Sequence, residues 1–135
     1  MRFHRLAFLT ASLALAGAVT HAAQLGTSRS VNSGVYTEAQ ATRGEAAYKN
    51  HCSSCHYQTE FSGDDFLKRW ADKPLWELWD VITTNMPEDE PGSLPDQQYA
   101  DVISFFLKLN KFPTGGSDLE GTPEAMKDTL MERPH

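Results

Sequence analysis

The chain of 135 residues contains two cysteines, and their spacing sets the first limit on how it can fold. Cys52 and Cys55 are three residues apart, so a disulfide between them would close a very short loop and could not join distant segments. The length fits one domain rather than two. Stability must therefore come from packing around a core, and the two cysteines need another role.

Apolar residues recur with helical spacing in three stretches, and no stretch alternates between apolar and polar residues over the length of a strand. The first predicted helix is capped by Thr37, with Gln40 completing a capping-box pattern, and ends near residue 50. The second follows Pro74 and stops by Pro87, and the third is capped by Asp96 and ends before residue 113. The residues expected on the buried faces are Ala39, Gly44, Ala47 and Tyr48 in the first helix, Leu75, Leu78, Trp79 and Ile82 in the second, and Tyr99, Val102, Ile103, Phe106 and Leu107 in the third. The pattern predicts an all-α fold without a sheet.

Two long connections, residues 57–73 and 86–95, are too polar or too rich in proline to pack on their own. Ordering a chain of this size costs on the order of 100 kcal/mol in conformational entropy, and three modest helices bury limited apolar surface against that cost. We therefore expect a large buried cofactor to organise these connections.

The pentapeptide Cys52-Ser53-Ser54-Cys55-His56 has the C-x-x-C-H pattern of covalent c-type haem attachment. At the end of a helix, cysteines three apart face the same way, so each can form a thioether to one vinyl group of a single porphyrin. The following residue, His56, then points its imidazole at the iron. The sequence predicts one covalently attached haem c.

Three other kinds of site use closely spaced cysteines. A thioredoxin-like redox pair belongs with a βαβ pattern, which is absent from this sequence. A zinc site needs four ligands, and besides the pentapeptide only His51 is close. An incidental disulfide would leave the long connections unorganised. Haem accounts for the motif, the helices and the connections together.

Met86 is the predicted second axial ligand of the iron. It follows the second helix, and Pro87 restricts its backbone to extended conformations. Met126 and Met131 lie in the C-terminal tail and are expected to cover apolar surface, while His51 is expected to face solvent. The alternative for Met86 is a core methionine that fills a gap. Coordination by His and Met raises the haem potential and leaves no open position for a substrate, so electron transfer is expected rather than catalysis.

The chain resembles class I c-type cytochromes, and specifically the single-haem cytochromes that accompany or are fused to periplasmic quinoprotein dehydrogenases using pyrroloquinoline quinone. The resemblance covers about residues 33–131, and its most specific parts are C-x-x-C-H and Met86-Pro87. The other matching segments are Gly34-Val35-Tyr36-Thr37, Gln40-Ala41, Arg43-Gly44, Tyr48, Phe66, Trp70, Leu75, Leu78, Ile82, Pro91-Gly92-Ser93-Leu94-Pro95, Tyr99 and Asp101-Val102. Many relatives carry a small residue where this chain has Tyr57, so packing beside the haem is expected to differ there.

The resemblance implies a cytochrome c fold, with three main helices and long loops wrapped around one covalently bound haem. It implies that the first helix crosses the last through Gly44 and Tyr48, near Phe106. It also makes Trp70 a candidate donor to a haem propionate. A core tryptophan whose N–H is bonded elsewhere is the alternative for that residue.

Residues 1–22 have the pattern of a cleaved export signal. Arg2 and Arg5 precede an uncharged stretch at 6–19, and small residues lead up to Ala22. A retained membrane anchor is the alternative, but the uncharged stretch is shorter than the roughly 20 apolar residues of a membrane span. The expected segments are a signal peptide at 1–22, a surface lead-in at 23–36, a monohaem cytochrome c domain at 37–112 and a tail at 113–135, in which Thr122 caps a short helix with Met126 and Leu130 on one face.

Charge bears on the partners. Twelve basic and 18 acidic residues give a net charge of −6, which argues against nucleic acid. The consecutive residues Glu88, Asp89 and Glu90, with Asp64 and Asp65 on another loop, are expected to ring the haem opening and steer a basic partner; the alternative is a merely solvated acidic surface.

The predicted function is that of a periplasmic monohaem c-type cytochrome, an electron carrier and not an enzyme. It would transfer single electrons from a quinoprotein dehydrogenase to a downstream acceptor, such as a terminal oxidase or a second cytochrome, without a stable membrane span. The alternative is a haem subunit of an enzyme complex, or a haem-based ligand sensor in which Met86 leaves the iron.

Overall fold

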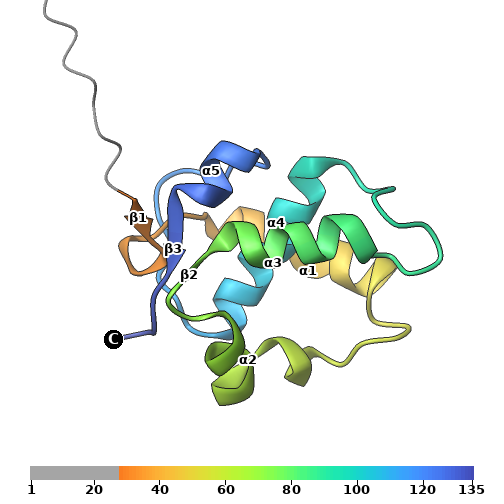
Figure 1. Cartoon of the computed structure of the whole chain (residues 1–135), viewed down its shortest axis with the longest axis horizontal. Coiled ribbons are helices and arrows are strands. Elements are labelled where there is room, and N and C mark those ends of the chain that lie inside the picture. Colours follow the sequence, from red (N-terminus) through yellow and green to blue (C-terminus); the bar gives the residue numbers. More distant parts are fainter. Residues whose placement is uncertain (1–27) are drawn as a thin grey trace, which may run out of the picture.

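The computed structural model describes residues 28–135, and helices dominate this part of the chain (Figure 1). The predicted signal peptide lies outside the described residues. In chain order the elements are β1 (Arg29–Ser30), the 3-10 turn η1 (Val31–Ser33), α1 (Glu38–His51), the 3-10 turn η2 (Gln58–Phe61), α2 (Gly63–Trp70), β2 (Lys73–Pro74), α3 (Leu75–Asn85), α4 (Asp96–Leu109), α5 (Pro123–Lys127) and β3 (Thr129–Met131). The predicted all-α class is confirmed. Within residues 28–135, no helix is both long and apolar enough to cross a membrane.

Helix α1 begins where the sequence predicted, but its cap uses half of the capping box. The Thr37 hydroxyl accepts a 3.0 Å hydrogen bond from the Gln40 backbone N–H. The Gln40 side chain is buried and bonds instead to Asp101 and to the backbone of Leu119. Ala39 is exposed, which corrects its expected place on the packing face, because Gln40 and Ala41 take the buried positions.

Helices α1 and α4 cross at the centre of the fold through a glycine. A Cβ atom on Gly44 would lie 1.8 Å from the backbone oxygen of Asp101 in α4, so only glycine permits this approach. Beside the crossing, the ring centroid of Tyr48 lies 5.6 Å from that of Phe105 and 6.2 Å from that of Phe106. The expected crossing of the first and last main helices is confirmed.

The apolar faces predicted for the second and third helices are buried in α3 and α4. Asp96 does not cap α4, because Pro95 occupies the cap position and Asp96 lies in the first turn. In the first turn, its negative charge still interacts favourably with the positive end of the helix dipole and stabilises the helix. Asn85 ends α3, two residues before Pro87, as expected.

The connection at 57–73 contains structure that the sequence reading missed. Its second part is helix α2, which has Asp64 and Asp65 in its first turn and Lys68 in its last, in the order that complements the helix dipole. Phe66 is its one fully buried residue and packs edge-on against Phe106. Asp64 and Asp65 therefore lie on a helix and not on a loop.

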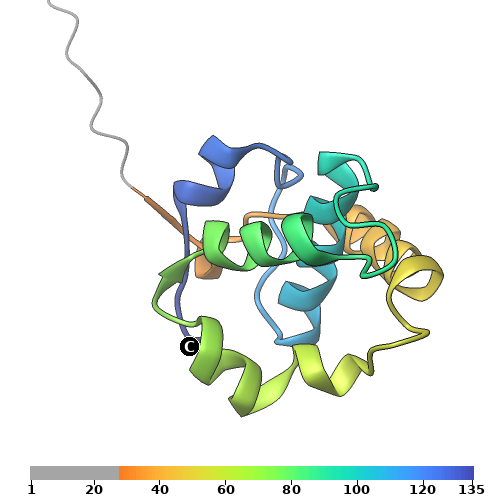
Figure 2. The ribbon, with the colours of Figure 1, turned by 45° about the vertical axis from the view of Figure 1, so that its right-hand side comes forward.

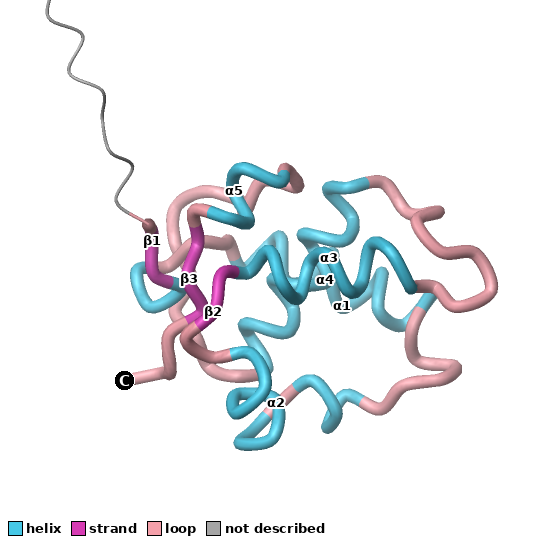
Figure 3. Tube along the Cα trace, viewed as in Figure 1, coloured by secondary structure: helices cyan, strands magenta, loops and turns pink. Residues whose placement is uncertain are grey.

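Three very short strands form a small sheet that brings the two ends of the described chain next to residues 73–74. Strand β3 pairs in parallel with β1 and antiparallel with β2 (Figure 3). This small sheet corrects the expectation of no strands, and Leu130 lies in β3 rather than on the tail helix. The cap of α5 by Thr122 is confirmed, with Thr122 Oγ1 accepting from Ala125 N. Met126 and Met131 are both buried, as expected of tail methionines that cover apolar surface.

The described part of the lead-in segment belongs to the core. Val31, Val35 and Tyr36 are each at most 4% exposed, and the Tyr36 hydroxyl donates to the backbone oxygen of Phe112 at 2.7 Å. The surface position expected for 23–36 is thus wrong for these three residues. The segment's described regular elements are a two-residue strand and the three-residue turn η1, which are too short to show helical periodicity.

Candidate haem site

A cavity of about 570 Å³ is bordered by residues from α1, η2, α2, α3 and α4 and from the loops after α1 and α3. In the turned view of Figure 2, α2 lies below α3, and the loop after α1 runs down to it. Much of the cavity wall is apolar and consists of Phe61, Leu78, Val81, Ile82, Leu94, Val102 and Phe106. The volume is within the usual range for a cofactor site, about 300–1,000 Å³. All five predicted site residues line it: Cys52, Cys55, His56, Trp70 and Met86.

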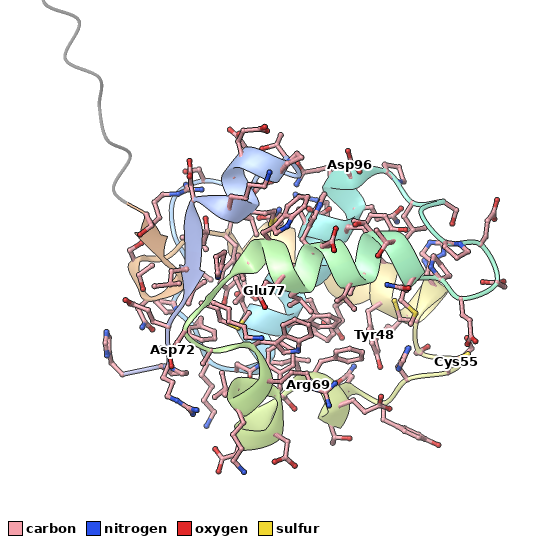
Figure 4. All side chains as sticks on the ribbon, in the orientation of Figure 1. Tyr48, Cys55, Arg69, Asp72, Glu77 and Asp96 are labelled. Carbon is pink, nitrogen blue, oxygen red and sulfur yellow. The ribbon has the colours of Figure 1, made fainter. Side chains whose placement is uncertain are left out.

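The cysteines are brought together by turns that follow the end of α1. The Cys52 backbone N–H donates to the oxygen of Tyr48 at 2.9 Å, and then the N–H groups of Cys55 and His56 both donate to the oxygen of Cys52, at 3.1 and 3.0 Å. Both thiols are free; Cys52 is half-buried and Cys55 is exposed, at the edge of the fold in Figure 4. Burial raises the pKa of the Cys52 thiol. The spacing therefore places two thiols and one imidazole on one cavity, as the motif predicted.

His56 is held at three points. Its backbone oxygen accepts a 2.6 Å hydrogen bond from the Tyr48 hydroxyl. Its Nδ1 atom lies 3.1 Å from Glu60 Oε2, and its ring packs edge-on against Phe61 with centroids 5.4 Å apart. The pKa of Glu60 is lowered by the hydrogen bond from the Tyr57 backbone and then by that from His56. The sequence analysis did not identify Glu60, because His56 precedes η2 and the two residues do not share one helix, so no helical spacing signalled the pair.

Met86 is the residue that follows α3, and its backbone is extended, with φ −127° and ψ 148°. This is the conformation predicted from Pro87. The Met86 N–H donates to the oxygen of Ile82 at 3.1 Å, and its own oxygen accepts a 2.7 Å hydrogen bond from the Tyr99 hydroxyl. The sequence placed Tyr99 on the buried face of α4 but did not assign a partner to its hydroxyl. A tyrosine at a buried position needs such a partner, and that is the signal that could have found this contact.

Trp70 ends α2 and is partly buried against the core. Trp70 lines the cavity, so a role as donor to a haem propionate and a core role with its N–H bonded elsewhere both stay predictions. Arg69, the preceding residue, also lines the cavity and comes from the lower helix in Figure 4. Two donor groups from α2 thus border the cavity and are available to an anionic group.

The competing kinds of site do not fit this geometry. The described part of the chain has no group of three or more His, Cys, Asp or Glu side chains that could hold a metal ion by themselves. Its only parallel strand pair joins β1 to β3, far apart in sequence, and is not a βαβ unit. His51 is exposed at the rim, and Met126 and Met131 do not line the cavity.

The acidic residues are divided between two places. Glu88 and Asp89 line the cavity, while Glu90 is exposed and does not. Asp64 and Asp65 do not border it either, and Asp65 pairs with Lys68 on its own helix. The acidic rim that the structure supports is therefore smaller than the one expected from sequence, and consists of Glu88 and Asp89.

The donor set fits a haem c. Two thiols, one imidazole nitrogen and one thioether line the same cavity, which matches two attachment points and the His/Met ligand pair of cytochromes c. The helical fold and this site define a class I c-type cytochrome domain, the kind that binds covalently attached haem c. A family model described as cytochrome C oxidase, cbb3-type, subunit III matches residues 39–106, half of the chain, and the chain belongs to this family. The chain has no match among curated proteins or solved structures.

Proposed function

We propose that this chain is an exported monohaem cytochrome of the periplasm that carries single electrons and is not an enzyme. The observation that carries the proposal is the convergence of Cys52, Cys55, His56 and Met86 on one largely apolar cavity. Membership of a cytochrome c family implies haem-based electron transfer. The proposed haem domain spans 37–112 and follows a cleaved signal at 1–22.

Each site residue has a proposed role. Cys52 and Cys55 would hold the haem through thioether bonds, and His56 and Met86 would bind its iron. Trp70 would donate its indole N–H to a haem propionate. When bound, the haem supplies a one-electron couple between ferric and ferrous iron. Because His56 and Met86 would both bind the iron, no position on it would be left for a substrate, which supports a carrier.

The rest of the cavity keeps the two ligands in place and is largely apolar. Tyr48 donates to the backbone of His56 and Tyr99 to the backbone of Met86, so a helix on each side fixes one ligand-bearing segment. Apolar side chains such as Phe61 form much of the walls. Fixed groups in a largely apolar cavity need little rearrangement when the charge of the site changes, which favours fast electron exchange.

The open side of the cavity is the proposed place of electron exchange. Cys55 is exposed there, Val81 is 43% exposed, and Glu88 and Asp89 add negative charge. We propose a basic redox protein as the partner, bound briefly over a small area. A quinoprotein dehydrogenase is the proposed donor on the strength of the sequence resemblance, and a terminal oxidase or a second cytochrome is the proposed acceptor.

A haem subunit of an oxidase complex is the second candidate function, because the matching family model is described as an oxidase subunit. The chemistry at the site would be the same, but the protein would be bound stably in a complex. The native mass of the protein purified from its own membranes and periplasm separates the two candidates. A free species of monomeric size supports the carrier, and a stable large complex supports the subunit.

The central test is expression of the full chain in a host able to attach haem. We expect a coloured periplasmic product that lacks residues 1–22, has the mass of the polypeptide plus one haem, and gives a c-type pyridine haemochrome. A colourless product with the mass of the bare polypeptide contradicts the proposal.

The role of Met86 is tested by Met86→Ala, with Met126→Ala as the control because Met126 does not line the cavity. Met86→Ala is expected to lower the midpoint potential and to let carbon monoxide shift the Soret band of the reduced protein. Met126→Ala should do neither. Rapid carbon monoxide binding by the unmodified protein would favour a ligand sensor instead.

A further inference from the structure

The Nδ1 nitrogen of His56 has a charged neighbour, Glu60. This leaves the other ring nitrogen, Nε2, for a ligand role. The Nδ1 atom lies 3.1 Å from Oε2 of Glu60, within hydrogen-bond distance. Among residues 28–135, Glu60 is the side chain that contacts this nitrogen within hydrogen-bond distance. A histidine that binds a metal through one nitrogen commonly donates the N–H of the other to such an acceptor, which fixes its tautomer and its orientation.

The Glu60 carboxylate is held in position by a second contact. Its other oxygen, Oε1, accepts a 2.8 Å hydrogen bond from the backbone N–H of Tyr57, the residue that precedes η2. One carboxylate thus bridges the first turn of η2 and the imidazole ring. A carboxylate that is bound at both oxygens has less freedom to leave His56 than an unattached surface side chain.

The turn that carries Glu60 is itself anchored in the core. The ring of Phe61 stacks on Phe106 with centroids 4.2 Å apart and planes 1° from parallel. The backbone oxygen of Phe61 accepts from the Asn110 side chain at 2.8 Å, and Asn110 Oδ1 accepts from the Gly63 N–H at 2.9 Å. The C-terminal end of η2 is therefore fixed to α4 and its C-cap residue Asn110. The backbone of His56, just before η2, is held by the Tyr48 hydroxyl of α1.

We propose that Glu60 is a positioning residue that accepts a hydrogen bond from the Nδ1–H group of His56 and lowers the reduction potential of the site, an inference that rests on the proposed role of His56 as an iron ligand. The oxidised site carries one more positive charge than the reduced site, and the electron that separates them comes from the redox partner. A carboxylate on the imidazole N–H makes the ring a stronger electron donor and stabilises the more positive state. Glu60 therefore offsets part of the rise in potential that a methionine ligand produces.

A structural role alone would also explain why Glu60 is present, because it caps η2. The two roles differ in what they change. Loss of the cap of η2 lowers the free energy of unfolding but does not change the reduction potential. Loss of the hydrogen-bond acceptor for His56 changes the reduction potential. Glu60→Gln separates them, because an amide oxygen can still accept from Tyr57 while the negative charge beside His56 is removed.

The first experiment compares the midpoint potentials of the haem-loaded wild type, Glu60→Gln and Glu88→Gln. Glu88 also lines the cavity, so its substitution removes the same charge without touching the imidazole. We expect Glu60→Gln to raise the potential by a tenfold change in the redox equilibrium constant, about 59 mV for one electron. Glu88→Gln should raise it by clearly less. Equal shifts in both variants, or none in Glu60→Gln, would overturn the proposal.

The second experiment examines the bond between the iron and the histidine directly. In a Met86→Ala background, the reduced protein exposes that bond to resonance Raman spectroscopy. Addition of Glu60→Gln should lower the iron–histidine stretching frequency, because the imidazole becomes a weaker donor. An unchanged frequency contradicts the proposal, whatever happens to the melting temperature.

The outcomes keep this inference apart from the proposed function. If the wild type carries no c-type haem, or shows no histidine ligation, the proposed function fails first. If it is a normal c-type haem protein and Glu60→Gln changes neither readout, only the role of Glu60 fails. Should Glu60→Gln not accumulate with haem, Glu60→Asp keeps the charge but shortens its reach, and it should still raise the potential; an unchanged potential in that variant also overturns the proposal.

Discussion

The hydroxyl group of Tyr99 in α4 donates a 2.7 Å hydrogen bond to the backbone oxygen of Met86. The same hydroxyl accepts from the backbone N–H of Leu94 at 3.4 Å. It therefore joins the two ends of the connection between α3 and α4. The sequence analysis assigned the ordering of this connection to the cofactor alone. The buried side chain of Tyr99 provides part of that ordering.

Tyr99→Phe should loosen the Met86 segment. The substitution keeps the ring and removes the hydroxyl, at a cost of about 1 kcal/mol in the free energy of unfolding. We also expect faster carbon monoxide binding by the reduced protein, because Met86 is held less firmly. Tyr36→Phe is the matched control: its hydroxyl also donates to a backbone oxygen at 2.7 Å, but it does not line the cavity. Equal carbon monoxide rates in the two variants would mean that only global stability has changed.

Tyr36 should make stability fall at alkaline pH. Burial, with a smaller effect from the charge of Glu38, raises the pKa of Tyr36 to about 12, whereas tyrosine in an unfolded chain titrates near 10. Between about pH 10 and pH 12 the unfolded chain loses this proton and the folded protein keeps it, so the free energy of unfolding decreases as pH rises. Below that window the residue contributes no slope. Denaturant unfolding at several pH values should show a shallower decline in Tyr36→Phe than in the wild type; the same decline in both would contradict this prediction.

The parts of the fold that the sequence predicted are those with a long periodic signal. Helices α1, α3 and α4 have 14, 11 and 14 residues, and each repeats its buried positions several times or carries a cap signal. Helix α2 buries only Phe66 completely, so it shows no repeat. Strands of two or three residues are too short to alternate, and the pairing of β1 with β3 joins positions about 100 residues apart. Such elements depend on tertiary contacts that no local pattern contains.

The sequence predicted the part of the site whose residues are close together in the chain. Cys52, Cys55 and His56 are neighbours in sequence, and their placement on one cavity follows from the helix end and the turns after it. The contacts that hold the ligands are of a different kind. Tyr99 lies in α4 and donates to the backbone of Met86 after α3. The Gln40 side chain, predicted to cap a helix, bonds instead to Asp101, which is 61 residues away. The sequence predicted the crossing of α1 and α4 only as a contact between helices and gave no sign of these partners.

Gly44→Ala should disrupt that crossing. The added Cβ atom would lie 1.8 Å from the backbone oxygen of Asp101, so the helices would have to move apart. Overpacking of this kind costs about 1–3 kcal/mol, and more where backbone is the obstacle. We expect a large fall in melting temperature and a reduced yield of haem-loaded protein. Gly116→Ala is the control, because a Cβ atom there has no heavy atom within 4 Å; similar losses in both variants would remove the steric explanation.

Neutralisation of the acidic segment after Met86 should change the rate of electron exchange according to the charge of the partner. Glu88 and Asp89 line the cavity, and Glu90 is exposed beside them. In the triple variant Glu88→Gln, Asp89→Asn, Glu90→Gln, oxidation by cationic cobalt phenanthroline should become about tenfold slower at low salt, and oxidation by anionic ferricyanide should become faster. Stopped-flow measurement across a range of ionic strength checks both, and the differences should shrink as salt screens the charges.

The matched control neutralises three exposed acidic residues of the tail, with Glu120→Gln, Glu124→Gln and Asp128→Asn. None of the three lines the cavity, so the net charge changes by the same amount away from the site of exchange. If steering depends on the local field at the cavity, this variant should differ little from the wild type with either reagent. If both triple variants respond alike, the overall charge governs the rate and the acidic segment after Met86 has no special part in recognising a partner.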